Sequence, residues 1–142
     1  MICASEDVSN ADPMALVVAT SAAQAVERIG MPEARIILSQ AALYVATAPK
    51  SNACYMAIDK ALDVVKNSKT APVPVHLQDA HYKGSAKLGH GVGYLYAHDY
   101  PNHYVRQQYL PDAYVNEKFY EPGDMGYERD IMKHLDKIKS EA

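Results

Sequence analysis

Five of the six histidines, His76, His81, His90, His98 and His103, lie within 28 residues of one another, which raises the question of a metal site. Zinc and iron sites usually draw their ligands from closely spaced histidine pairs on one helix face or strand, or from paired cysteines. Here the separations are five, nine, eight and five residues, without a supporting glutamate or cysteine pair. The spacing therefore favours imidazoles that hydrogen-bond to loop backbone, and a metal-dependent enzyme is only a remote alternative.

A glycine-rich run, Gly89-His90-Gly91-Val92-Gly93, resembles a phosphate-binding loop superficially. A dinucleotide-binding loop stands between a strand and the start of a helix, and a Walker loop ends in Gly-Lys-Ser/Thr. This run instead leads into two tyrosines. We therefore expect its glycines to provide backbone freedom, and we expect the chain to bind no cofactor of its own.

Oxygen-bearing residues near the start of the chain, Glu6, Asp7, Asn10 and Asp12, suggest a cation loop at first. An EF-hand, however, needs oxygen ligands at alternate positions followed by glycine, and Ala11 interrupts that series. Asp12 stands directly before Pro13, which is typical of a helix start. The sequence therefore predicts that Asp12 caps a helix.

Four residues are candidate nucleophiles: Ser5, Ser39, Ser51 and Cys54. None of them lies in a Gly-x-Ser-x-Gly elbow or in a recognisable cysteine-protease context. Each is better explained as a helix cap or a small packing residue. The sequence therefore predicts no catalytic residue in this chain.

The tract from Gly89 to Asp112 is rich in tyrosine and histidine, and exposed aromatic rings can stack on single-stranded bases when basic residues lie among them. Arg106 is the only lysine or arginine between Tyr94 and Tyr114, so an aromatic cluster at a domain or subunit boundary is the favoured interpretation. The candidate interface or structural residues are Tyr94, Tyr96, His98, Asp99, Tyr104, Gln108 and Tyr109.

The overall charge gives little support to a dedicated nucleic-acid module. The formal net charge is −3, and acids and bases are interspersed in both halves of the chain. Nucleic-acid binding usually needs a concentrated basic face. Two cysteines fifty residues apart favour reduced thiols, and no run of about 20 apolar residues is present. We expect an intracellular, soluble protein with no membrane contact.

The first half of the chain carries helical periodicity. Asp12 and Gly30 bracket a first helix with Leu16, Ala19, Ala23 and Val26 on one face. The next helix, over 36–46, is apolar nearly all round, which predicts a position at the centre of the core; Pro49 ends it. A third helix begins after the cap Ser51, and its predicted inward residues are Tyr55, Ile58, Leu62 and Val65. Short turns predict that the three helices are antiparallel.

The second half is different in character, because nine of eleven tyrosines and six of seven glycines follow residue 80. Two prolines make 67–78 an extended connector. One or two helical turns are predicted over 82–88, ended by Gly89, and an irregular segment follows. The last helix is predicted to begin near Asp124, with Ile131, Leu135 and Ile138 on its inner face. The sequence thus predicts one all-α domain over 1–142: a helical bundle, an irregular Tyr/Gly-rich segment and a C-terminal helix.

Five strings occur in an order that is informative: ASEDVSNADP, then AVERIGMPEARIILSQAALYVATAPKSNACYMAID, APVPVHLQDA, LGHGVGYLYAHDYP and QQYLPD. Together they resemble the C-terminal region of the MgsA/RarA family. These are the bacterial replication-associated recombination ATPases, related to the eukaryotic Werner helicase-interacting ATPase. The resemblance covers almost the whole chain. Two departures concern local loops: Ser9 stands where glycine is expected, and HYKGSAKLG is unusually polar.

The resemblance implies an AAA+ protein whose ATPase domain, with its ATP and Mg, lies upstream of an excised C-terminal fragment. It implies that this fragment is similar to a clamp-loader collar and assembles a homotetramer. No Walker A or Walker B motif is present in this sequence. We therefore expect a non-catalytic tetramerisation domain of a protein that acts at stalled replication forks, in the cytoplasm and on the nucleoid.

The expected partners are further copies of the chain and its own AAA+ domain. DNA and a single-stranded-DNA-binding protein are possible partners of the full-length protein. The alternative hypothesis is a DNA-contacting module of the same protein, for which the aromatic residues near Arg106 are the motivation.

Overall fold

The computed structural model describes residues 1–82 and 84–141, and its contacts divide the chain into two compact units. Unit 1 comprises Met1–Asp63 with Phe119–His134, and unit 2 comprises Val64–Lys118 with the chain from Leu135 onward. No β-strand occurs among the described residues, so the predicted all-α class is confirmed. Within the same ranges, no helix is long and apolar enough to cross a membrane. The single domain over 1–142 stays a prediction.

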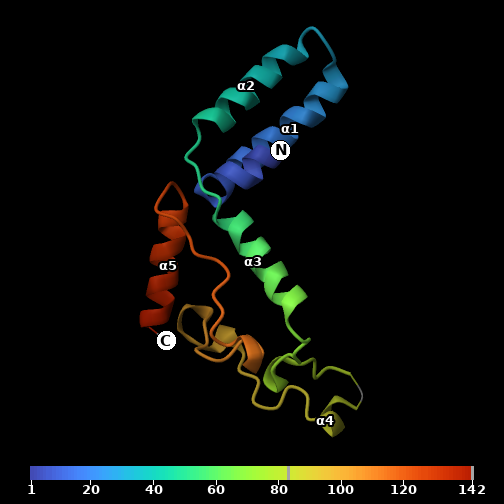
Figure 1. Ribbon diagram of the computed structural model, residues 1–142, viewed down its shortest axis with the longest axis vertical. Helices are drawn as coiled ribbons and strands as arrows, with labels where there is room; N and C mark the ends of the chain where they lie inside the picture. Colours follow the sequence, from blue (N-terminus) through green and yellow to red (C-terminus); the bar gives the residue numbers. More distant parts are fainter. Residues whose placement is uncertain (83, 142) are drawn as a thin grey trace. The chain divides into compact units, whose positions relative to one another are not determined.

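Unit 1 is built on a hairpin of two helices, α1 (Met14–Ile29) and α2 (Ala34–Thr47), which Figure 1 shows side by side. The Asp12 carboxylate accepts a hydrogen bond from the Met14 N–H at 3.1 Å, which satisfies one of the free donors of the first turn. Gly30 ends the helix with a φ of 72°, in the left-handed region that glycine adopts without strain. Both predicted ends of the first helix are therefore confirmed.

The core of unit 1 lies where the start of the chain meets the hairpin. A π-helical turn, η1 (Ala4–Val8), and a 3-10 turn, η2 (Ser9–Ala11), precede α1. Ala4, Val8 and Ala15 form the buried cluster, and partly buried side chains of Ala19, Val45 and Ala48 pack against it. The core thus consists mainly of alanines, which allow the backbones to approach closely.

The predicted position of α2 at the centre of the core is wrong for the isolated chain. Ala34 is its one buried residue among those described, while Ile36 and Leu43 are 64% and 63% exposed. The sequence pattern indicated cover on several sides of the helix, but one copy of the chain covers one side. The apolar periphery of α2 is left open to solvent.

The third helix, α3 (Ala53–Asn67), begins where predicted, with the Ser51 hydroxyl accepting a hydrogen bond from the Ala53 N–H at 3.2 Å. It contains no buried residue among those described, and the side chains predicted to face inward are exposed: Tyr55, Ile58, Leu62 and Val65. The extensive helix contact of unit 1 joins α1 to α2, and α3 has no comparable contact within the described ranges. The predicted antiparallel set of three helices is therefore wrong in its third member.

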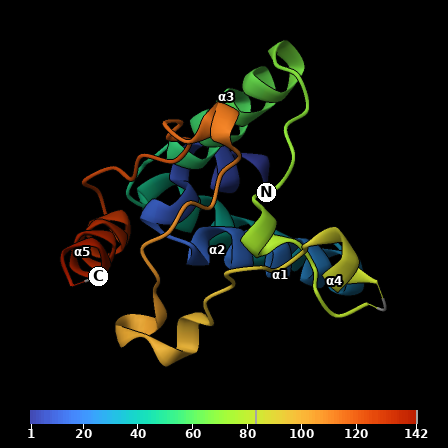
Figure 2. The ribbon, with the colours of Figure 1, turned by 90° about the horizontal axis from the view of Figure 1, so that it is seen from below.

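Unit 2 is mostly irregular, as the sequence predicts, and Figure 2 shows loops interrupted by short turns. The predicted connector contains one 3-10 turn, η3 (Val75–Leu77). A single helical turn, α4 (Ser85–Leu88), follows and ends at Gly89 with a φ of 72°; Lys83 of the predicted 82–88 segment lies outside the described residues. The tract continues through three 3-10 turns, η4 (Ala97–Asp99), η5 (Pro101–His103) and η6 (Asp112–Tyr114).

The last helix, α5 (Glu128–Ser140), begins later than the predicted Asp124. Gly126 lies between these two residues and has a positive φ of 55°, which a right-handed helix does not contain. Ile131, Leu135 and Ile138 are all half-buried, as their spacing predicts. The inner face of α5 was therefore predictable, but its first turn was not.

Candidate functional site

The seven candidate residues of the tyrosine-rich tract fall into two groups. Four of them, Tyr94, Tyr96, His98 and Asp99, are exposed. The Tyr96 and His98 ring centroids are 5.1 Å apart, and those of His98 and His103 are 4.8 Å apart, so these three rings form a chain on the surface of unit 2. Such an exposed row of rings can contact another surface, because both ring faces and edges remain available.

The other three candidates hold the loop in shape. The Tyr109 hydroxyl donates to the Val105 carbonyl at 2.7 Å, and its ring lies 6.4 Å from that of Tyr104. The Gln108 amide donates to the Leu110 carbonyl at 2.8 Å and to Asp112 Oδ1 at 2.7 Å. These bonds satisfy backbone groups that a loop without regular structure leaves free. Tyr104, Gln108 and Tyr109 are therefore structural in this unit.

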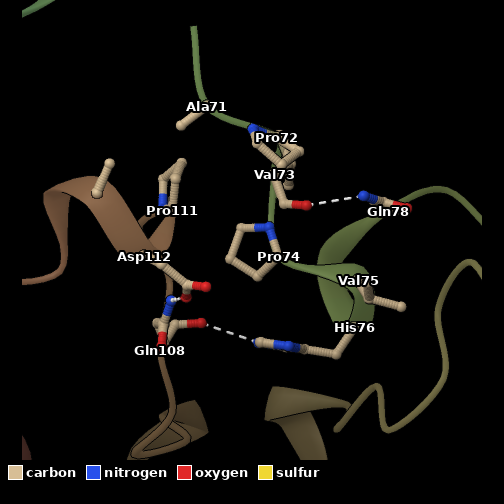
Figure 3. A pocket seen from close by; sticks show the side chains of 11 residues that line it. Ala71, Pro72, Val73, Pro74, Val75, His76, Gln78, Gln108, Pro111 and Asp112 are labelled. Atoms are coloured by element: carbon tan, nitrogen blue, oxygen red, sulfur yellow. Dashed lines mark hydrogen bonds between the residues drawn. The ribbon is translucent and has the colours of Figure 1, made fainter. Parts of the chain in front are cut away.

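Gln108 also borders a cavity of about 500 Å³ in unit 2, shown in Figure 3. The His76 Nε2 atom lies 2.8 Å from the Gln108 carbonyl oxygen across one wall, and the Gln78 amide donates to the Val73 carbonyl at 2.7 Å on another. Three prolines complete the lining: Pro72, Pro74 and Pro111. His76 thus does what the sequence analysis expected of the histidines, which is to pair with loop backbone.

This cavity offers little to a reaction. Its polar groups are engaged in holding the walls together, and its lining carries no serine or cysteine among the described residues. Over 1–82 and 84–141, no group of three or more His, Cys, Asp or Glu side chains is placed to hold a metal ion. The pocket suits an apolar or weakly polar group rather than a reacting one.

The best-organised polar site in unit 1 centres on Glu128, which the sequence analysis did not single out. Its side chain is 0% exposed. Glu128 Oε2 accepts hydrogen bonds from the Ser51 hydroxyl at 2.6 Å and from the Gly123 N–H at 2.7 Å, and Oε1 accepts one from the Tyr120 hydroxyl at 3.0 Å. A buried carboxylate with several donors is well stabilised. The site ties the start of α5 to the turn before α3.

Asn10 extends this network to the N-terminal segment. Its amide donates to Cys54 Sγ at 3.2 Å and, more weakly, to the Tyr120 hydroxyl at 3.5 Å. Burial raises the pKa of Tyr120, the carboxylate of Glu128 adds to that rise, and the Asn10 amide opposes it. The tyrosine therefore stays protonated and keeps its proton available for Glu128.

The network gives a structural role to two residues that the sequence offered as nucleophiles. Ser51 caps α3 and donates to Glu128, and Cys54 accepts a hydrogen bond from Asn10. An acidic residue in the first turn of a helix was the available signal for Glu128. Its partner Ser51 lies 77 positions away, and no local pattern could connect the two.

Apolar surface left open to solvent is the main remaining feature of unit 1. Large apolar side chains are exposed along both helices of the hairpin and along α3, including Leu16, Val17, Ile36, Leu38, Leu43, Tyr55, Ile58 and Leu62. Large uncovered apolar patches on a water-facing surface mark sites of association. We therefore regard the hairpin and α3 as the candidate functional surfaces.

Two grooves run along the hairpin between α1 and α2. The first, of about 510 Å³, is lined by six alanines together with Leu38, Val45, Met1, Cys3 and Lys50. The second, of about 450 Å³, is lined by Met14, Val17, Val18, Ser21, Ala22, Ala25, Ile37, Gln40 and Ala41. Both grooves are open and lined mainly by apolar residues, which suits the side chains of a partner helix better than a small substrate.

The structure thus shows an all-α chain with open apolar faces on the hairpin and on α3. The family described as MgsA AAA+ ATPase C terminal matches residues 1–139, and the chain belongs to this family. The resemblance found in the sequence strings is thereby confirmed.

Relatives in bacteria and eukaryotes match nearly the whole chain. An uncharacterized AAA domain-containing protein of Mycobacterium tuberculosis is 49% identical over 140 residues, covering 99% of this chain and 31% of the relative. Replication-associated recombination protein A of Bacillus subtilis is 43% identical, covering 97% and 33%. ATPase WRNIP1 of Dictyostelium discoideum is 40% identical, covering 83% and 14%. The chain therefore spans about a third of the length of these bacterial relatives or less.

Proposed function

We propose that this chain is the non-catalytic oligomerisation domain of a replication- and recombination-associated AAA+ ATPase, and that it assembles a tetramer that acts at stalled replication forks. The family and the names of the relatives support the replication and recombination context. The open apolar surface of the hairpin and of α3 supports assembly.

The exposed apolar side chains of the hairpin and of α3 are the observation that carries the proposal. Ile36 and Leu43 on α2 are 64% and 63% exposed, and Ile58 on α3 is 54% exposed. Apolar side chains of this size are usually buried, and a group of them on a water-facing surface marks a site of association.

The catalytic function of such a protein belongs to a separate AAA+ domain in this proposal. That domain would supply ATP and Mg binding, and this chain would hold copies of it together in the manner of a clamp-loader collar. The exposed ring row of Tyr96, His98 and His103 is a second surface for contact with another subunit or with the ATPase domain, and Tyr94 and Asp99 are further exposed residues of the same tract. A cytoplasmic location with access to the nucleoid follows from the same proposal.

Light scattering on the purified 142-residue chain tests assembly directly. Because the contact surfaces are apolar, we expect a mass well above the 15.6 kDa of one chain, and we expect little change between low and high salt. A mass that fell steeply as salt rose would indicate a contact through charges and would contradict the proposed apolar interface.

The alternative of a DNA-contacting module has a separate test. Salt-titrated binding to single-stranded and forked DNA measures the number of phosphates that basic residues neutralise. With a net charge of −3, we expect no binding that survives about 0.1 M salt. Tight binding with a steep salt dependence would support the DNA-contacting module instead.

A further inference from the structure

Three large side chains form an exposed ridge on the part of α3 that belongs to unit 1. Tyr55, Ile58 and Leu62 are 43%, 54% and 45% exposed, and they follow one another at intervals of three and four residues. That spacing places them in line on one helical face, over a length of about 10 Å. The smaller residues Ala57 and Ala61 on a neighbouring face are half-buried instead, so the helix turns its bulkiest apolar side away from its own unit.

The first groove of the hairpin has the opposite character. Six of its eleven lining residues are alanines, which leave a floor without protruding side chains. Along α2 the groove extends from Leu38 to Ala46, a length of about 12 Å. A row of alanines flanked by larger residues is the surface into which a ridge on another helix packs closely.

The groove and the ridge also carry charges of opposite sign. Lys50 lines the groove beyond the C-terminal end of α2, where its ammonium group donates to the carbonyls of Val45 at 2.8 Å and Ala48 at 2.6 Å. The ridge on α3 carries acidic neighbours, Asp59 and Asp63, at the positions directly after Ile58 and Leu62. A helix that lays this ridge along the groove brings carboxylates toward the cation.

We propose that the α3 ridge of one copy of this chain seats in the alanine-lined groove of the α1–α2 hairpin of a second copy. This inference rests on the proposed function and specifies which surfaces meet. Ridge and groove are different surfaces, so the contact is head to tail, and each copy has one of each to offer. A head-to-tail contact closes into a ring when each copy is rotated by a whole fraction of a turn from the next, and a quarter turn gives the proposed tetramer.

A mixing experiment tests the head-to-tail contact. Ala42 is an exposed residue of the groove, and Ala42→Arg blocks the groove without removing the ridge. Ile58→Glu places a charge in the middle of the apolar ridge and leaves the groove unchanged. We expect each variant alone to weaken assembly by more than about 30-fold in dissociation constant. Mixed in equal amounts, the two variants should form a pair of twice the chain mass, because one intact ridge and one intact groove remain.

The matched control is Thr47→Arg, which introduces the same charge at an exposed polar residue of α2 that lines neither groove. It should assemble like the unchanged chain. Helix content by circular dichroism checks that each variant is folded, and Leu62→Glu replaces Ile58→Glu if the latter is not.

The outcomes separate this inference from the proposed function. An unchanged chain that is monomeric contradicts the proposed function. An unchanged chain that assembles, with variants that do not pair on mixing, contradicts the ridge-in-groove contact alone and indicates a contact between identical surfaces. Loss of assembly in Thr47→Arg would place the contact on the outer face of α2 and would overturn the inference as well.

Discussion

Glu128 illustrates how a single buried carboxylate can join segments that are distant in the sequence. It lies at the first turn of α5, where the helix dipole favours negative charge, and it receives hydrogen bonds from Ser51, Tyr120 and Gly123. A buried charge is stable only while its hydrogen-bond donors remain in place. The residue is therefore expected to be among the most sensitive in unit 1.

Replacing Glu128 with Gln tests this expectation. The amide removes the charge and turns a donor toward at least one of the hydroxyl and N–H groups that now donate to the carboxylate. We expect a loss of about 1–3 kcal/mol in the free energy of unfolding, measured by urea denaturation at fixed chain concentration. The exposed Glu27→Gln should change the same quantity by less than about 0.5 kcal/mol. Equal losses would show that the network contributes nothing beyond the charge.

Asp79 provides a second test at the residue scale. The backbone N–H of His81 and, next, its ring hold the pKa of Asp79 below the ordinary value of a carboxyl. The interaction therefore stabilises the folded state above the ordinary pKa of an aspartate, and this contribution is lost as the pH falls through the folded-state pKa.

We expect His81→Ala to raise the pKa of Asp79 part of the way toward the ordinary value, because the ring is lost and the backbone donor stays. Carbon NMR titration of the Asp79 carboxyl group measures the change. His90 acts on the same carboxyl only at longer range, so His90→Ala should produce a smaller rise. A larger rise in His90→Ala than in His81→Ala would contradict the local contacts.

At the scale of elements, the chain shows which features local patterns determine. The ends of α1, the cap of α3 and the irregular tract were predicted correctly, because Asp12, Gly30 and Ser51 act within a turn of their own positions. The packing of α2 and α3 was not predicted correctly, because apolar periodicity shows which face of a helix avoids water but not whether the same chain covers that face. Of the candidate site residues, the structure gives loop-fixing bonds to Gln108 and Tyr109, and Glu128 escaped notice because its partners are remote.

The entry to α5 depends on a glycine for two reasons. Gly126 has a positive φ, and a Cβ atom added there would lie 2.0 Å from the Ala11 carbonyl oxygen. Gly30 also has a positive φ, but nothing lies within 4 Å of its Cβ position. A substitution at Gly30 therefore tests backbone strain alone, whereas one at Gly126 tests backbone strain together with steric overlap.

We expect Gly30→Ala to lower the free energy of unfolding by about 1–3 kcal/mol, because a φ of 72° with a ψ of 178° is a backbone conformation almost confined to glycine. Gly126→Ala should lower it considerably more, because the backbone of the N-terminal segment must also move. Denaturant unfolding of both variants measures the difference. Equal losses at the two glycines would mean that the close approach to Ala11 does not exist in solution.

At the scale of the whole molecule, the account depends on surface that one copy leaves open. In the proposed assembly, the exposed apolar residues on α2 and α3 would be covered by other copies, which would account for the burial that the sequence predicted and a single chain does not provide. The family to which the chain belongs, and its cover of about a third of its bacterial relatives, agree with a domain that works as part of a larger protein.

Sedimentation equilibrium of the 142-residue chain over a wide range of concentrations tests the central claim most directly, because it measures mass without assumptions about shape. The account predicts a mass that approaches four times 15.6 kDa and falls only on strong dilution. A mass of 15.6 kDa at every concentration would contradict it.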